Sequence, residues 1–378
     1  MKIGVPRETA PGERRVALVP ETAARLAKRG LEILFEPGCG DSAFYPDADY
    51  VKAGAKAGDP FEADVLLKVQ KPATAEASKL REGSTLISFL YPLFNPDLVK
   101  KIAARKANAV AIDMLPRTTI AQSMDALSSQ ANLAGYKAVV IAAERLPRFF
   151  PMLMTAAGTI TPARVLVMGA GVAGLQAIGT AKRLGAVVEA TDVRPETKEQ
   201  VESLGGKFLE VTGVEVKAGA GGYAAEQSEE YKRRQAELIA DRIGKADVVI
   251  TTALIPGRKA PILVTDAQVR SMRPGSVIVD LAAEQGGNVE GTVSGQEVER
   301  HGVRLVGHPN LPSTMAAHAS QLYSRNLEKL LLHLLNKEAT AFKWDLAEEI
   351  AKGCVIVHQG QVVHPKVKEA VEKAGGAA

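Results

Sequence analysis

The stretch RVLVMGAGVAGLQAIGTAKRLGAVVEATD, residues 164–192, decides the fold of this chain. An apolar run leads directly into a turn that contains Gly169, Gly171 and Gly174, a segment with helical spacing follows, and a second apolar run ends at Asp192. Strand, glycine turn, helix, second strand and acidic residue within about 30 residues are the context that a dinucleotide-binding fingerprint requires. We therefore expect a βαβ unit of a doubly wound sheet at these residues.

Each glycine of this turn has its own physical task. Gly169 permits the tight turn, Gly171 lets the backbone approach a pyrophosphate, and Gly174 allows the helix to pack closely on the strand. The start of the helix then presents N–H groups to the two negative charges. The Asp192 carboxylate is placed to accept hydrogen bonds from the adenosine ribose and would repel a 2′-phosphate, so NAD(H) is expected rather than NADP(H). Arg194 weakens this preference, because a nearby arginine accommodates a 2′-phosphate.

Apolar runs of strand length recur on both sides of this unit. Four runs after it complete six strands, which is enough for one full nucleotide-binding sheet. Five runs before it alternate with helical patterns such as residues 20–29 and 96–106, which predicts a second parallel sheet covered on both faces. The fold class is therefore α/β, with two doubly wound, Rossmann-like domains. The expected strands are residues 2–5, 32–35, 65–69, 85–90 and 110–115, then 165–168, 187–191, 208–211, 248–252, 277–281 and 304–306.

Two long helical patterns are expected to join the domains. Residues 118–150 carry Ala, Leu and Val at helical spacing and should cross into the second domain, and residues 315–335 carry Leu three and four apart and should cross back. We therefore place an N-terminal α/β domain at residues 1–130, completed by C-terminal helices within 315–378. The nucleotide-binding domain is placed at residues 131–314.

The composition argues against several classes of function. The 378 residues are 46% hydrophobic and 24% charged, as in ordinary globular proteins, and the net charge of +4 comes from interspersed charges, so no nucleic-acid partner is expected. Cys39 and Cys354 are far apart and the six His residues form no cluster, so neither disulfides nor a metal site is expected. The start of the chain lacks the apolar core of a signal peptide. No run of about 18 uncharged apolar residues occurs, so direct membrane insertion is not expected.

Four segments closely resemble the soluble NAD(H)-binding component (alpha subunit, domain I) of proton-translocating transhydrogenase, and the resemblance covers nearly the whole chain. They are IGVPRETAPGERRVALVPE (3–21), PRTTIAQSMDALSSQANLAGYKAV (116–139), MGAGVAGLQAIGTAKRLGAVVEATDVR (168–194) and ADVVITTALIPGRKAPILVT (246–265). The resemblance implies that hydride passes directly between NAD(H) here and NADP(H) on a partner subunit, with a membrane proton-channel subunit as a further partner. It also implies a homodimer located peripherally on the cytoplasmic face of the membrane.

The same resemblance assigns roles to single residues. It implies that Arg117, Gln122 and Asp125 orient the nicotinamide and its ribose as catalytic residues, and that Ser128 holds the carboxamide. Read without the family, these are polar residues on a linker. Tyr223 matches the tyrosine of a mobile loop that closes over the nucleotide, and the glycines on both sides of it are typical of a lid. Cofactor contacts are implied for Gly169, Gly171, Val172, Ala173, Gly174, Asp192, Val193, Arg194, Ala253 and Leu254.

Alanine dehydrogenases share many of these landmarks and are the main alternative. Arg15 and Lys71 stand where that family places its substrate-carboxylate cations, which leaves open whether they bind a ligand here. The general-acid histidine of that family, however, corresponds to Tyr91, and its catalytic aspartate to Glu284. Tyrosine, with a pKa of about 10, is a poor proton shuttle at neutral pH, whereas direct hydride exchange needs no such shuttle. The sequence therefore favours a transhydrogenase component, with an amino-acid dehydrogenase and a non-catalytic NAD(H)-binding module as alternatives.

Overall fold

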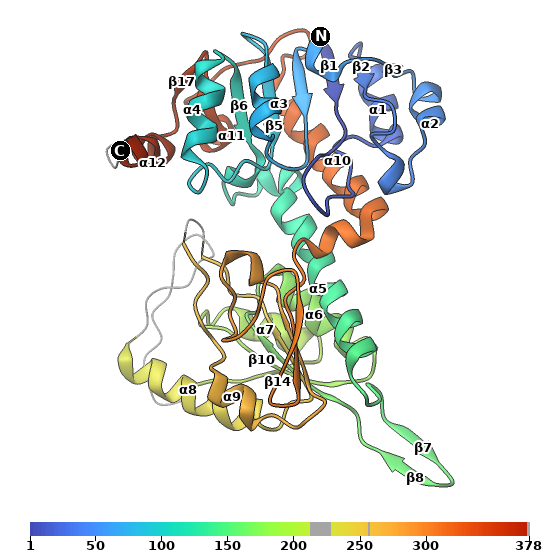
Figure 1. Cartoon of the computed structure of the whole chain (residues 1–378), viewed down its shortest axis with the longest axis vertical. Coiled ribbons are helices and arrows are strands. Elements are labelled where there is room, and N and C mark those ends of the chain that lie inside the picture. The colour runs from blue at the N-terminus through green and yellow to red at the C-terminus, as the bar shows by residue number, and fades with distance from the viewer. Residues whose placement is uncertain (212–227, 256–257, 376–378) are drawn as a thin grey trace. The chain divides into compact units, whose positions relative to one another are not determined.

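The structure is a computed structural model that describes residues 1–211, 228–255 and 258–375 (Figure 1). The chain divides into two compact units. Unit 1 consists of Met1–Gln130 and Pro312–Ala378, and unit 2 consists of Ala131–Leu311. Each unit contains one large sheet with helices packed against it. None of the helices formed by the described residues combines the length and the hydropathy that a membrane crossing demands.

Unit 1 is built on an eight-stranded sheet in the order β17-β16-β6-β5-β4-β1-β2-β3. The strands β1 to β6 are parallel and have the 3-2-1-4-5-6 order of a doubly wound fold, whereas β16 and β17 are antiparallel additions at one edge. The strands are β1 (Lys2–Val5), β2 (Glu32–Phe35), β3 (Lys56–Ala57), β4 (Val65–Leu67), β5 (Thr85–Ser88), β6 (Asn108–Ala111), β16 (Val355–His358) and β17 (Gln361–Val362). The helices are α1 (Pro20–Ala27), α2 (Asp47–Lys52), α3 (Thr74–Lys79), α4 (Pro96–Ala104), α10 (Ala316–Leu334), α11 (Glu349–Cys354) and α12 (Pro365–Gly375), with the 3-10 turns η1 (Asp41–Ala43), η2 (Pro60–Glu62), η3 (Ile112–Met114) and η4 (Ile120–Met124).

The sheet of unit 1 is covered on both faces, which explains its apolar strands. Along β4, Val65 and Leu67 belong to one core cluster and Leu66 belongs to another, because successive side chains of a strand point to opposite faces. The first cluster includes buried leucines of α10, and the second includes apolar residues of α4 and α12. Helices on both faces are the usual environment of a parallel sheet.

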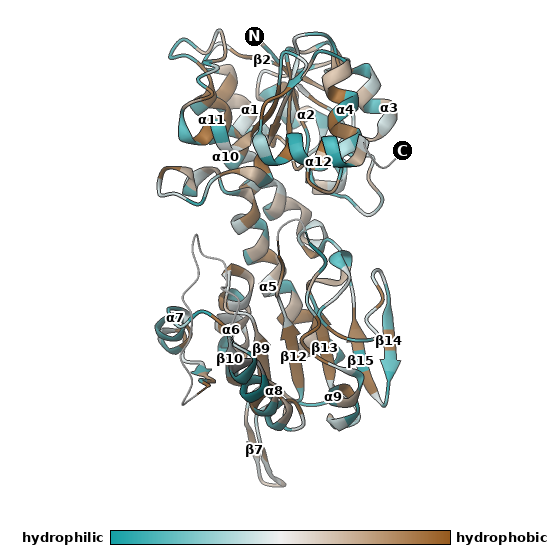
Figure 2. Ribbon diagram, turned by 90° about the vertical axis from the view of Figure 1, so that its left-hand side faces the viewer, coloured by the Kyte–Doolittle hydropathy of each residue, from teal (hydrophilic) through white to brown (hydrophobic). Residues whose placement is uncertain are grey.

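Unit 2 repeats the same arrangement with the sheet order β11-β10-β9-β12-β13-β15-β14, in which only β14 is antiparallel. Figure 2 shows the fully buried strands β12 and β13 in brown and the edge strand β14 largely in teal. The strands are β9 (Arg164–Met168), β10 (Val187–Thr191), β11 (Lys207–Phe208), β12 (Val248–Thr251), β13 (Val277–Asp280), β14 (Glu297–Arg300) and β15 (Val303–Val306), and a separate hairpin pairs β7 (Leu153–Thr155) with β8 (Gly158–Ile160). The helices are α6 (Val172–Arg183), α7 (Thr197–Ser203), α8 (Glu229–Ile243) and α9 (Asp266–Ser271), with the 3-10 turn η5 (Ala283–Gln285).

The predicted fold class, α/β with two doubly wound sheets, is confirmed, and the connections between the units differ from the prediction in one respect. The first connection is α5 (Ala126–Arg145), which starts in unit 1 and continues into unit 2. The second is the 3-10 turn η6 (Leu311–Met315), because α10 lies wholly within unit 1. The helix does not cross back, because it begins only at Ala316, after the boundary between Leu311 and Pro312.

Several elements were mispredicted or not predicted from the sequence. The predicted strand at 110–115 ends at Ala111, where the chain turns into η3. The strands β3, β14, β16 and β17 and the hairpin of β7 and β8 were not predicted. All of them are short, and all except β16 lie at a sheet edge or outside the main sheets, where a strand needs no continuous apolar run. β16 lies between β17 and β6 and has a buried apolar run, Val355–Val357, which the prediction overlooked. The C-terminal segment of unit 1 therefore contributes two strands as well as helices.

Candidate nucleotide-binding site

The fingerprint turn joins β9 to α6 in unit 2, and two of its glycines are required by packing. Gly169 has a φ of +104°, and a Cβ added there would lie 2.4 Å from Thr252 Oγ1. A Cβ on Gly174 would lie 1.8 Å from the carbonyl oxygen of Gly169, so α6 rests directly on the turn. Neither position accommodates a side chain.

Gly171 faces open space instead. Of the described residues, only Arg194, with Nη2 at 3.8 Å, comes within 4 Å of a Cβ built on Gly171. The helix α6 begins at Val172, next to Gly171, and no described side chain caps its start. Since the N–H groups in the first turn of a helix have no partner within the helix, they point into this space. An anion such as a pyrophosphate fits this arrangement of donors and open room.

The Asp192 carboxylate is anchored beside the turn by four hydrogen bonds. The backbone N–H groups of Ala170 and Arg194 donate to it at 2.7 and 2.9 Å. The Arg194 guanidinium donates two more from Nε and Nη2, each at 2.9 Å. A carboxylate offers about four acceptor sites, so all of them are in use. Ribose hydroxyls would therefore have to replace the two bonds from the Arg194 side chain, while the two backbone bonds keep the carboxylate in place.

The end of β12 completes this edge of the sheet. Thr252 Oγ1 donates to the carbonyl oxygen of Gly169 at 3.1 Å, which joins the residues after β12 to the fingerprint turn. Ala253 follows, and the next side chain, Leu254, is 45% exposed. The strand order reverses between β9 and β12, and doubly wound proteins hold their ligands in the crevice at this point. The structure thus brings together the fingerprint glycines, Asp192 and Ala253.

In unit 1, the four residues to which the sequence assigned nicotinamide roles lie between Arg117 and the first turn of α5, which contains Ser128. Asp125 accepts hydrogen bonds from the N–H of Ser128 at 2.9 Å and from its hydroxyl at 2.5 Å. An acidic side chain bonded to the N–H three residues later is the geometry of a helix N-cap, so Asp125 caps α5. Arg117 and Gln122 are exposed. The structure therefore pairs two of the four residues and gives that pair a structural task.

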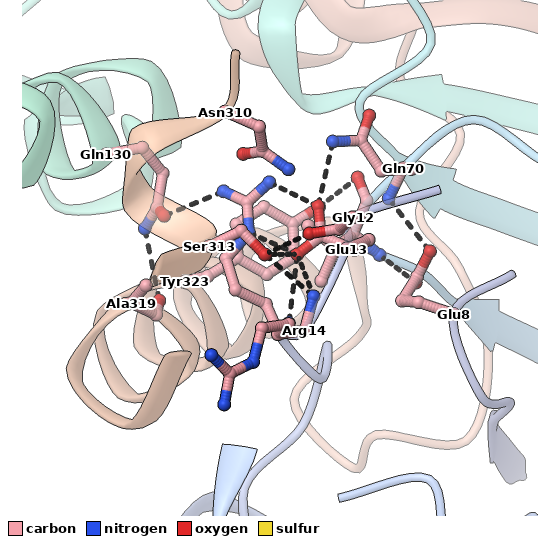
Figure 3. A network of polar contacts seen from close by, with 12 residues as sticks. Glu8, Gly12, Glu13, Arg14, Gln70, Gln130, Asn310, Ser313, Ala319 and Tyr323 are labelled. Atoms are coloured by element: carbon pink, nitrogen blue, oxygen red, sulfur yellow. Dashed lines mark hydrogen bonds and ion pairs between the residues drawn. The ribbon is translucent and has the colours of Figure 1, made fainter. Parts of the chain in front are cut away.

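Arg15 is buried in unit 1. Its partners Glu13 and Gln130 belong to the polar network shown in Figure 3. The Arg15 guanidinium donates to both Glu13 oxygens, at 2.8 and 2.6 Å, and to Gln130 Oε1 at 2.8 Å. Gln70 and Ser313 donate to the same carboxylate. Burial alone would raise the pKa of Glu13, but the hydrogen bonds and charge of Arg15 outweigh burial and lower this pKa to about 2. The Arg15 cation is thus paired within the protein.

The other residues at alanine dehydrogenase positions also have structural contacts. Lys71 Nζ donates to Asn95 Oδ1 at 2.5 Å. Tyr91 has a φ of +45°, and its N–H donates to the half-buried Asp113 carboxylate at 3.0 Å. Burial raises the pKa of Asp113 to about 6, against the lowering effect of its backbone hydrogen bonds. In unit 2, Glu284 accepts a hydrogen bond from the Asn310 N–H at 3.2 Å.

Some residues of the site could not be compared with the prediction, and others were missed. Tyr223 lies outside the described residues. Within the described ranges, no group of three or more His, Cys, Asp or Glu side chains is placed to hold a metal ion. Sequence reasoning missed Thr252, which contacts Gly169, and Gly135, where a Cβ would lie 2.0 Å from the Ala173 carbonyl oxygen. No sequence signal marks contacts that exist only after the chain has folded.

Comparison with known proteins identifies the family. Residues 4–134 match the model for the alanine dehydrogenase/PNT N-terminal domain, and residues 138–365 match that for the alanine dehydrogenase/PNT C-terminal domain. A protein of Rhodospirillum rubrum that is named as one portion of NAD(P) transhydrogenase subunit alpha is 48% identical over 377 residues, which cover 97% of this chain and 98% of that protein. An alanine dehydrogenase of Mycolicibacterium smegmatis is 32% identical over 299 residues, covering 77% of this chain and 74% of that protein.

A solved structure agrees with these relatives. The crystal structure of transhydrogenase from Sinorhizobium meliloti superposes with a TM-score of 0.87 at 46% identity, covering 96% of this chain and all of that one. Identity and coverage are thus higher for the transhydrogenase proteins than for the alanine dehydrogenase. The chain therefore belongs to the alanine dehydrogenase/PNT family, in which it is related to the alpha subunits of NAD(P) transhydrogenase.

Proposed function

We propose that the chain is the NAD(H)-binding half of a proton-translocating transhydrogenase and that it exchanges hydride directly with NADP(H) on a partner subunit. The observation that carries the proposal is the glycine turn under the uncapped start of α6 with Asp192 anchored beside it. The 48% identity to a transhydrogenase alpha subunit supports it. NAD(H), when bound, supplies the nicotinamide that gives or takes the hydride. Gly169, Gly171, Val172, Ala173 and Gly174 would hold its pyrophosphate, Asp192, Val193 and Arg194 its adenosine, and Ala253 and Leu254 its nicotinamide half.

The polar contacts of unit 1 favour this function over amino-acid dehydrogenation. An amino-acid dehydrogenase needs a free cation for the substrate carboxylate and a group that transfers a proton. Arg15 is already paired with Glu13. A tyrosine, Tyr91, stands where that family has its general acid. Direct hydride exchange needs neither feature, because it depends on bringing two nicotinamides together in the correct orientation.

The proposal includes partners and a location. The name of the relative from Rhodospirillum rubrum describes it as one portion of a subunit, which supports an assembly of several chains. We assign NADP(H) binding and the proton channel to two such partner subunits. This chain would then lie peripherally on the cytoplasmic face of the membrane, attached through its partners, as a homodimer.

Within this function, Arg117, Gln122, Asp125 and Ser128 would orient the nicotinamide. Gln122 is exposed and has no acid–base chemistry, so its contribution is geometric. A displacement of about 1 Å costs about a hundredfold in rate, whereas one neutral hydrogen bond contributes only about 0.5–1.5 kcal/mol to binding. We expect Gln122→Ala to keep NADH affinity within about tenfold while single-turnover transfer falls about a hundredfold. A transfer rate that follows NADH occupancy alone would contradict the orienting role.

One set of assays separates the three functions. NADH oxidation is measured first with pyruvate and ammonium, and then with the NADP(H)-binding subunit of a transhydrogenase and an NADP analogue. We expect oxidation only in the second assay. Turnover of about 10 per second in the first, a typical enzymatic rate, would identify an amino-acid dehydrogenase. NADH binding without oxidation in either assay would identify a binding module.

A further inference from the structure

Asn288 is a fully buried residue of unit 2 whose side-chain amide binds the backbone of the loop after β12. Its Oδ1 accepts the Ala253 N–H at 3.0 Å, and its Nδ2 donates to the Ala253 carbonyl oxygen at 2.9 Å and to that of Pro261 at 2.8 Å. One amide thus pairs with both polar groups of Ala253, as a neighbouring strand would. The orientation of the amide is unambiguous, because the reverse would place an NH₂ group against the Ala253 N–H.

Asn288 is itself held rigidly by Asp280, the buried last residue of β13. Asp280 Oδ2 accepts the Asn288 N–H at 2.8 Å, and Oδ1 accepts the Ala282 N–H at 2.9 Å. Gly286 and Gly287, with φ values of +99° and +78°, make the turn that returns the chain to this carboxylate. A Cβ on Gly287 would lie only 3.0 Å from Asp280 Oδ2. The end of β13 therefore fixes the Asn288 backbone, from which the side-chain amide extends to Ala253.

Ala253 lies where the second half of a dinucleotide is expected. A doubly wound sheet is built from two mononucleotide-binding halves and holds a dinucleotide across the crevice between them. The fingerprint and Asp192 belong to the half that begins with β9, which receives the adenosine. The other half begins with β12, which ends at Thr251, and Ala253 and the exposed Leu254 follow it after one residue. The backbone that Asn288 holds is thus the one next to the nicotinamide half.

We propose that Asn288 is a positioning residue for the nicotinamide half of NAD(H). Its amide fixes the Ala253 peptide, so that Ala253 and Leu254 present a fixed surface to the nicotinamide nucleotide. Asn288 does not touch the cofactor and acts through Ala253. The inference rests on the proposed NAD(H)-binding function and adds to it a residue that no fingerprint contains.

The test compares two ligands on the full chain. NADH carries both nucleotides, whereas 5′-AMP carries only the adenosine half. We expect Asn288→Ala and Asn288→Asp to weaken NADH binding by about tenfold or more and to change 5′-AMP binding by less than about threefold. Asn288→Asp keeps the volume and the acceptor for the Ala253 N–H but loses both donors, so it remains informative if the alanine variant does not fold. Calorimetry gives the affinities, and thermal melting without ligand gives the stability.

Asn108 provides a matched control in unit 1. Its buried amide also clamps backbone, because Oδ1 accepts the Gln359 N–H at 2.8 Å and Nδ2 donates to the Gly83 carbonyl oxygen at 3.1 Å. We expect Asn108→Asp to lower the melting temperature without weakening the binding of NADH or 5′-AMP. Equal losses of NADH and 5′-AMP affinity in the Asn288 variants, or no loss of either, would overturn the positioning role. Misfolding of both Asn288 variants while Asn108→Asp folds would also overturn it, and an unmutated chain that fails to bind NADH would instead refute the proposed function.

Discussion

Asp192 and Arg194 form a preassembled pair whose two members have opposite effects on cofactor selection. The Asp192 carboxylate suits ribose hydroxyls and repels a 2′-phosphate. The hydrogen bonds to Asp192 raise the pKa of Arg194, so the guanidinium remains charged and close to the carboxylate. Selection between NADH and NADPH therefore depends on the pair rather than on the acid alone.

Substitution of each member should shift selectivity in opposite directions. A hydrogen bond to a charged group contributes about 1.5–3 kcal/mol. Asp192→Asn should therefore weaken NADH binding by about tenfold or more and reduce the preference for NADH over NADPH. Arg194→Ala removes the cation that tolerates a 2′-phosphate and frees two acceptor sites on Asp192. This variant should bind NADH within about threefold of the original and lose at least about tenfold in NADPH affinity. Titration calorimetry measures both, and a narrower preference in Arg194→Ala would contradict this account.

Asp113 predicts a measurable dependence of stability on pH. Below pH 3.8 the carboxyl is protonated in both the folded and the unfolded chain, and between pH 3.8 and about 6 only the unfolded chain releases the proton. The free energy of unfolding therefore falls as pH rises through this window. Because the pKa of Asp113 is about 6 in the folded chain, the free energy of unfolding should fall by about 3 kcal/mol across this window.

An Asp113→Asn variant lacks this titration. Its free energy of unfolding, relative to that of the unmutated chain, should rise by up to about 3 kcal/mol between pH 3.5 and pH 7, whatever constant penalty the amide brings. Urea unfolding at several pH values measures the difference. Asp97→Asn controls for removal of a carboxylate, because the Asp97 side chain is 89% exposed. A pH-independent difference for Asp113→Asn would show that this carboxyl does not titrate abnormally.

At the scale of elements, α6 illustrates how one helix contains two different glycines. Gly174 contacts the Gly169 carbonyl oxygen, whereas a Cβ on Gly179 would meet only ordinary contacts at 3.8 Å or more. Gly174→Ala should therefore lower the free energy of unfolding by about 1–3 kcal/mol, the usual cost of overpacking, and should also weaken NADH binding. Gly179→Ala should be neutral or stabilise by up to about 1 kcal/mol through helix propensity. Urea unfolding compares them, and equal effects would show that α6 does not rest on the turn as described.

The predicted elements are marked by local sequence patterns, whereas some of the missed elements depend on pairing with distant parts of the chain. The strand at Val187–Thr191 has the predicted bounds, because the local sequence pattern marks it. The place of the strands β16 and β17 in the sheet could not be predicted. β16 pairs with β6, which joins Val355 to Val110, and no local pattern encodes a partner so distant in the chain.

At the scale of the whole molecule, the hairpin of β7 and β8 predicts an interface between copies of the chain. Figure 1 shows it extending beyond the rest of unit 2, and it carries Met154, which is 71% exposed, and the exposed Ile160. Exposed apolar side chains gathered on one feature are typical of an interaction site. We expect a dimer in sedimentation analysis and a shift toward monomer in Met154→Asp. Val51→Asp, a change at an exposed residue of unit 1, is the control, and an unchanged dimer in Met154→Asp would exclude the hairpin from the interface.

The sequence by itself determined the two doubly wound sheets and the glycine turn, because repeating apolar runs and glycine spacing are local properties of the chain. Only the tertiary structure decided how the polar residues are used. Arg15 is paired with Glu13, Asp125 caps α5, and Arg194 forms an ion pair with Asp192. A charged or polar side chain is compatible with a ligand, a cap or an ion pair until folding sets its neighbours. Burial makes that choice matter, because a polar group removed from water must find a partner.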